Sequence, residues 1–157
     1  MFRLSRMTDY AVVVLSQMAR AGDAVFAAPD LADATGLPLP SVSKVLRLLA
    51  LGQLIASRRG AAGGYVLARA PEQINVAQII AALEGPVSLT ACVDGAEGSC
   101  KVETLCPLRG HWDVLNRAVR GALEQVSLAE LAAAPPSFIE IEPAPPVRPT
   151  AAASRAV

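Results

Sequence analysis

Apolar residues recur at helical spacing near the start of the chain. The stripe they form, with intervals of three or four residues, comprises Met7, Tyr10, Val14, Met18 and Ala21. This is the period of one face of an α-helix. Ser5 precedes the stripe and can cap a helix, whereas Gly22 follows it. The pattern therefore predicts a first helix over Arg6–Arg20.

Two more helical patterns follow and are separated by a tight turn. Pro29 and Gly36 suit the first turn and the C-terminal cap of a short helix over Pro29–Thr35. A third helix is predicted over Pro40–Leu51. Its buried face is expected to consist of Val42, Val45, Leu46 and Leu49. Two short helices joined by a glycine-containing turn are typical of a helix-turn-helix.

A hairpin is predicted directly after the third helix. Two short strands, Leu54–Ser57 and Tyr65–Ala68, flank a glycine-rich tip that carries Arg58 and Arg59. A hairpin in this position is a wing, and its arginines suit a phosphate or a minor groove. Tyr65, at the base of the wing, is expected to be a core aromatic residue.

Two helices are predicted in the second half of the chain. The first, Val76–Glu84, has a capping box formed by Asn75 and Gln78. The second, from Pro107 to Val126, carries an apolar seam at alternating intervals of three and four residues. The seam comprises Leu108, Trp112, Leu115, Val119, Ala122 and Val126. A seam of this kind often pairs with its own copy, so we expect a homodimer.

The fold class expected from these elements is mainly α: a winged helix-turn-helix with a two-stranded wing and a long C-terminal dimerisation helix. Residues 1–70 would form the DNA-binding region, and residues 71–133 a cysteine loop and the dimerisation helix. Residues 134–157 are rich in Pro and Ala and are expected to be a disordered tail.

The charge distribution differs between the two halves. Residues 1–70 carry eight basic and four acidic residues, and the rest carry six basic and ten acidic, which gives +4 and −4 within a net charge of zero. This split favours a polyanion partner for the first half. The residues predicted to contact double-stranded DNA are Ser41, Ser43, Lys44, Arg47, Arg58 and Arg59. The alternative is that these charges only solubilise the surface.

Three cysteines, Cys92, Cys100 and Cys106, lie within fifteen residues of an aperiodic segment that contains glycines. Three thiolates on one loop can converge on a soft metal centre. Zinc usually requires pairs of closely spaced ligands, which are absent here, so an iron–sulfur cluster is favoured. The alternative is three incidental buried thiols. A fourth ligand is open between Asp9, which could instead favour a helix dipole, and His111, which could be a surface residue.

Several classes of protein are not supported by this sequence. No apolar run approaches a membrane span, and the N-terminus resembles no signal peptide, so we expect a cytoplasmic protein in which disulfides are rare. One histidine, no nucleophile–base pair and no phosphate loop argue against an enzyme.

Taken together, these motifs resemble the Rrf2 family of winged-helix regulators, which includes the repressors IscR and NsrR. The likeness extends from residue 1 to about residue 133. Apart from the three cysteines, the motifs that carry it are Met7–Ala11, Gly36–Pro38, Val42–Leu46 and Arg59–Ala68. The resemblance implies a homodimeric repressor with a [2Fe–2S] or [4Fe–4S] cluster. The N-terminal opening is most similar to the branch of the family that accompanies SUF iron–sulfur assembly genes.

One departure from the family concerns the fourth ligand. The histidine ligand of the IscR pattern corresponds to Arg109 here, whereas the aspartate of the NsrR pattern corresponds to Asp9. The sequence thus predicts a transcription regulator that senses cluster status and represses iron–sulfur assembly genes. A metal-free thiol redox sensor or a nitric-oxide-responsive regulator is the alternative, and a protein-binding adaptor is a remote one.

Overall fold

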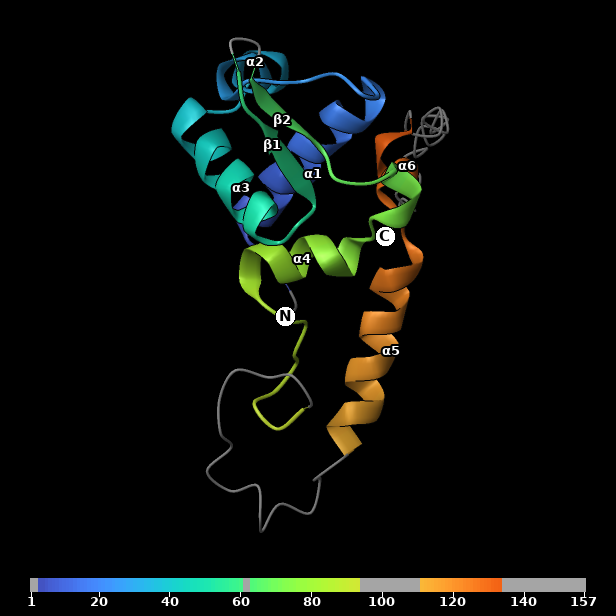
Figure 1. Cartoon of the computed structure of the whole chain (residues 1–157). Helices are drawn as coiled ribbons and strands as arrows, with labels where there is room; N and C mark the ends of the chain where they lie inside the picture. The colour runs from blue at the N-terminus through green and yellow to red at the C-terminus, as the bar shows by residue number, and fades with distance from the viewer. Residues whose placement is uncertain (1–2, 61–62, 94–110, 134–157) are drawn as a thin grey trace, which may run out of the picture.

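The computed structural model describes residues 3–60, 63–93 and 111–133 (Figure 1). The elements in chain order are α1 (Arg6–Arg20), α2 (Ala28–Thr35), α3 (Leu39–Leu51), β1 (Ile55–Arg58), β2 (Gly64–Leu67), the 3₁₀ turn η1 (Pro71–Gln73), α4 (Val76–Glu84), α5 (His111–Gln125) and α6 (Leu128–Ala132). The predicted mainly α fold with a two-stranded wing is confirmed. The predicted tail and the start of the last long helix lie outside the described residues. In the described ranges, no helix is long and apolar enough to cross a membrane.

The elements α1 to α4, with the wing, form one packed body, residues 3–84, which we call the head. Helix α1 lies at its centre, where it contacts α2, α3, α4, α6 and β2 (Figure 1). Ser5 caps it as predicted, since the Ser5 side chain accepts a hydrogen bond from the Thr8 amide. Its fully buried apolar residues are Ala11, Val14, Leu15 and Met18. The predicted stripe was wrong at one end: Ala21 is exposed and lies beyond the last helical turn, where no neighbour covers it.

The turn between α2 and α3 depends on a glycine. Gly36 ends α2 with a φ of 68°, a left-handed conformation in which a side chain is unfavourable. Leu37 packs against the core, and α3 starts at Leu39, immediately before Pro40. All four residues predicted for the inner face of α3 are buried. The helix-turn-helix is therefore held by α2, the turn and the inner face of α3.

The wing is an antiparallel pair in which Ser57 lies opposite Tyr65 and Arg58 opposite Gly64. Tyr65 also bridges to Phe26, with its amide donating to the Phe26 carbonyl at 2.8 Å. A Cβ on Gly64 would lie 2.4 Å from that carbonyl oxygen, so only glycine fits this strand position. Tyr65 packs on the core as predicted, and the bridge fastens the base of the wing to the segment after α1.

The end of α5 returns to the head through backbone pairing. The Leu128 amide donates to the Ile74 carbonyl at 2.7 Å, and the Val76 amide donates to the Val126 carbonyl at 3.0 Å. Helix α6 follows and packs on α1, which makes the segment after α5 part of the head. This helix was not predicted, although Ser127 and Glu130 form a capping box at its start.

A carboxylate joins α1 to the end of α4. Glu84 Oε1 accepts hydrogen bonds from the Ser5 amide at 2.8 Å and from the hydroxyl of Thr8, which is completely buried. The hydrogen bond from Thr8 and, less strongly, that from Ser5 hold the pKa of Glu84 below its usual value. Since Glu84 is the last residue of α4, this contact fixes the point at which the chain leaves the head.

We expect Glu84→Gln to weaken the fold in a pH-dependent way. The folded-state pKa is lowered, so the charged carboxylate contributes stability above the ordinary glutamate pKa of about 4.5 in the unfolded chain. It loses that contribution as the pH falls through the folded-state pKa. At pH 7 the variant should be less stable by about 0.5–1 kcal/mol because the group is largely exposed. Urea unfolding from pH 7 to pH 3 measures this difference, which should shrink below pH 4.5. Glu72→Gln, at another exposed carboxylate, is the control, and a difference independent of pH would contradict the prediction.

Candidate functional site

The outer face of α3 is polar and cationic. Ser43, Lys44 and Arg47 are exposed, and Ser41 is half-buried. They alternate with Val42, Val45, Leu46 and Leu49, which lie in the core. Because the inner face fixes the rotation of the helix, the structure presents the predicted DNA-contacting residues of α3 together on one surface.

The wing adds cations next to this helix. Arg58 ends β1, Arg59 follows it, and both side chains are exposed. In the described part of the chain, neither these arginines nor Lys44 and Arg47 form an ion pair with a carboxylate. Four cations without carboxylate partners on a helix and an adjoining hairpin suit the phosphates of a duplex.

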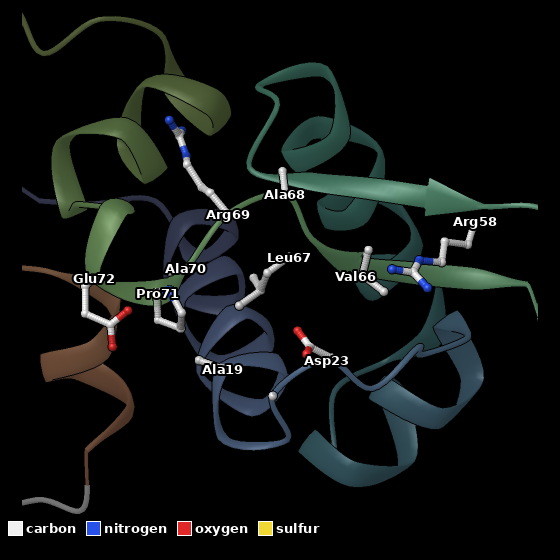
Figure 2. A pocket seen from close by; sticks show the side chains of 11 residues that line it. Ala19, Asp23, Arg58, Val66, Leu67, Ala68, Arg69, Ala70, Pro71 and Glu72 are labelled. Atoms are coloured by element: carbon white, nitrogen blue, oxygen red, sulfur yellow. The ribbon is translucent and has the colours of Figure 1, made fainter.

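Arg58 also borders a pocket of about 550 Å³ at the base of the wing, shown in Figure 2. Four charged side chains of both signs line it, namely Asp23, Arg58, Arg69 and Glu72. No residue of α3 contributes to the lining. The pocket is thus separate from the predicted base-reading surface, and the sequence analysis did not anticipate it.

Of the three predicted cysteine ligands, only Cys92 lies in the described residues. It is half-buried and forms no disulfide, and its Sγ lies 3.3 Å from the Thr90 hydroxyl. Cys100 and Cys106 lie outside the described residues. The two candidates for a fourth ligand are both exposed: Asp9 on the first turns of α1, and His111 at the first described residue of α5. Within the described ranges, no three His, Cys, Asp or Glu side chains could hold a metal ion together.

The segment that leads to Cys92 is bound to α5 by one side chain. Asn116 Oδ1 accepts a hydrogen bond from the Leu89 amide at 3.0 Å, and Asn116 Nδ2 donates one to the Val87 carbonyl at 3.1 Å. Asn116 and Glu84 were both missed in the sequence analysis. The available signal for Asn116 was a polar residue next to the apolar seam of an amphipathic helix, but its partners are 27 and 29 residues away.

The predicted dimer seam lies along one side of α5. Trp112 and Leu115 are 37% and 47% exposed and lie on the same face of α5, and adjoining exposed apolar side chains are typical of an interaction site. Ala122 and Val126 are also exposed, Val119 is half-buried, and Leu108 lies outside the described residues. In the single chain, α5 extends away from the head and packs against α4 (Figure 1). Most of its described apolar seam is therefore exposed to solvent in the single chain.

Comparison with known proteins gives one family and several relatives. A family model named Rrf2 and described as an iron-dependent transcriptional regulator matches residues 4–134. The HTH-type transcriptional repressor NsrR of Streptomyces coelicolor is 30% identical over 136 residues, which cover 85% of this chain and 90% of the relative. The HTH-type transcriptional regulator IscR of Aliivibrio salmonicida is 31% identical over 130 residues, which cover 82% of this chain and 76% of the relative.

Solved structures give the same fold. CymR of B. subtilis, described as its global cysteine regulator, aligns with a TM-score of 0.64 at 26% identity. The alignment covers 84% of this chain and 97% of CymR. The agreement therefore extends over nearly the whole of that structure.

Proposed function

The chain belongs to the Rrf2 family of transcriptional regulators, and on this premise we propose that it is a repressor controlled by an iron–sulfur cluster on Cys92, Cys100 and Cys106. As a member of this family it is a DNA-binding regulator and not an enzyme. One observation carries the proposal: the exposed cationic face of α3 and the arginines of the wing lie next to each other on the head. The cysteine segment leaves that same head.

Helix α3 is the recognition helix in this proposal. Ser41, Ser43 and Lys44 approach base edges in the major groove, while Arg47, Arg58 and Arg59 contact phosphates or the minor groove. Their exposure and the lack of carboxylate partners in the described residues support this assignment. Two heads in a dimer would read a pseudo-palindrome with half-sites about 10 bp, or a helical multiple, apart.

The donor set fits an iron–sulfur cluster. Thiolates are the usual protein ligands of such clusters, and the described thiol, Cys92, is half-buried and forms no disulfide. When bound, the cluster supplies a redox-active iron centre whose presence depends on the supply of iron and sulfide. Asp9 is our first candidate for the fourth ligand and His111 the second. The likeness to the NsrR pattern supports Asp9.

The dimer would form through the seam of α5, which large exposed apolar side chains support. Along the chain, the three cysteines come between α4 of the head and α5 of the interface. Binding or loss of the cluster would bias how the two heads stand relative to each other. A tenfold change in operator affinity needs about 1.4 kcal/mol of coupling, which is modest for one element. The genes controlled, in this proposal, are those of iron–sulfur assembly.

A metal-free thiol sensor is the second candidate. The structural similarity to CymR, described as a cysteine regulator, favours it. In that case an oxidant such as peroxide would join two of the three cysteines in a disulfide, and the two electrons and two protons released would reduce the peroxide to water. The residues of the DNA-binding surface would be the same. The two candidates differ in colour, because only a cluster absorbs visible light.

Iron content tests the sensor. Protein purified without oxygen should be brown, with two or four iron and sulfide ions per chain by analogy with known clusters. Cys100→Ala should lose the visible absorption, because one thiolate ligand is gone, while Ser99→Ala should keep it. If Cys100→Ala binds iron and DNA like the wild type, the cluster switch is ruled out. A colourless wild-type protein that still binds DNA would refute the cluster and favour the metal-free thiol sensor.

Salt-dependent DNA binding tests the wing. Arg59→Ala should lower operator affinity by about 1 kcal/mol, since one charge-assisted phosphate contact is lost. The slope of log affinity against log salt should decrease by about 0.9. Fluorescence anisotropy at several salt concentrations measures both quantities. Arg117→Ala, at an exposed cation on α5, is the control, and an unchanged slope for Arg59→Ala would refute the assignment of the wing.

Sedimentation equilibrium tests the dimer. Leu115→Glu places a charge within the apolar seam and should convert the dimer into monomers at micromolar concentration. Val114→Glu is the matched control, because Val114 is 62% exposed and lies on another side of the same helix. If both variants sediment like the wild type, α5 is not the interface.

A further inference from the structure

A short segment, residues 85–92, joins α4 to the first cysteine. These residues form neither a helix nor a strand, so their backbone groups find no partners in regular secondary structure. One end of the segment is fixed by Glu84, which binds α1. The other end contains Cys92, and something other than secondary structure must set its position.

Asn116 supplies this anchor. Its amide accepts from the backbone of Leu89 and donates to the backbone of Val87, at 3.0 and 3.1 Å. A primary amide can do both at once, as a neighbouring strand would, whereas a carboxylate can only accept. Both bonds fall within five residues of Cys92, and Thr90, which lies 3.3 Å from the cysteine sulfur, follows directly after Leu89.

The burial of Asn116 indicates that this role is specific. It is only 5% exposed, and it is the one buried residue on the described length of α5. A buried amide costs free energy unless its hydrogen bonds are satisfied, and an apolar residue would fill the same place without that requirement. An amide at this position is therefore explained by the backbone it binds and not by core packing.

The location on α5 links two parts of the proposed mechanism. At 100° per residue, Asn116 lies next to the apolar seam and about a quarter turn from its centre. The side chain that binds residues 85–92 thus belongs to the same helix that would form the dimer interface. Displacement of residues 85–92 would strain or break these two hydrogen bonds and so would act on α5.

We propose that Asn116 is a positioning residue, which holds the backbone of Val87 and Leu89 against α5, thereby fixes the position of the Cys92 thiol and so stabilises the bound cluster. This inference rests on the proposed function for its cluster part. The hold on the thiol itself can be measured without a cluster.

The test compares Asn116→Asp and Asn116→Leu with the control Arg117→Ala, which alters the exposed neighbour. Asn116→Asp keeps the shape but cannot donate to Val87, and Asn116→Leu fills the space with no polar group. In the apo protein, the rate at which iodoacetamide alkylates Cys92 is measured by peptide mass spectrometry. In the loaded protein, the rate at which a chelator removes iron is followed by absorption.

Both Asn116 variants should raise the alkylation rate of Cys92 about tenfold and the rate of iron loss about tenfold, because the segment opens more often. Arg117→Ala should stay within about twofold of the wild type on both measures. The alkylation rate of Cys106 in the same samples distinguishes local release of the Cys92 segment from general unfolding. Unfolding would raise the alkylation rates of both cysteines by the same factor.

Wild-type rates in folded Asn116 variants overturn the inference, and so does faster alkylation with unchanged iron loss, which would limit Asn116 to a structural role. Equal acceleration at Cys106 also overturns it. If the wild type holds no iron, the proposed function fails and the cluster part of the inference falls with it. The alkylation rates of Cys92 then still test whether Asn116 fixes the position of this thiol.

Discussion

Burial of the inner face of α1 is the interaction on which the rest of the structure depends. Ala11, Val14, Leu15 and Met18 are almost completely inaccessible to solvent, and the helix contacts α2, α3, α4, α6 and β2. Interiors packed in this way resist small displacements, because each shift would open gaps or cause clashes. The recognition helix and the wing base therefore share one rigid frame with α4, and a signal that moves α4 moves the DNA-binding surface as a unit.

Polar contacts govern the edge of this frame, where the chain leaves for the cysteines. Glu84 binds the first turn of α1, and Asn116 binds the backbone of the segment before Cys92. A single hydrogen bond contributes about 1 kcal/mol, which is similar to the coupling needed for a tenfold change in affinity. Two side chains hold this edge, whereas many packed residues hold the core, so the edge suits a switch and the core suits its support.

Local signals were sufficient for most elements. The apolar period and Ser5 predicted α1, the capping box of Asn75 and Gln78 predicted α4, and Gly36 predicted the end of α2. Helix α6 was missed because five residues carry too little periodicity, although Ser127 and Glu130 offered a cap signal. The predicted ligand, DNA-contact and interface residues stay predictions, and the structure adds where the described ones lie.

The sequence by itself determined the helix-turn-helix, the wing, the outer cations of α3 and the identity of the three cysteines, since each depends on residues within a few positions of one another. Only the tertiary structure decided that α6 returns to α1, that Glu84 reaches Ser5 and Thr8, and that Asn116 holds Val87 and Leu89. The partners in these contacts are separated by tens of residues. Periodicity and caps report short-range geometry, whereas a hydrogen bond across the fold exists only once packing has brought its two groups together.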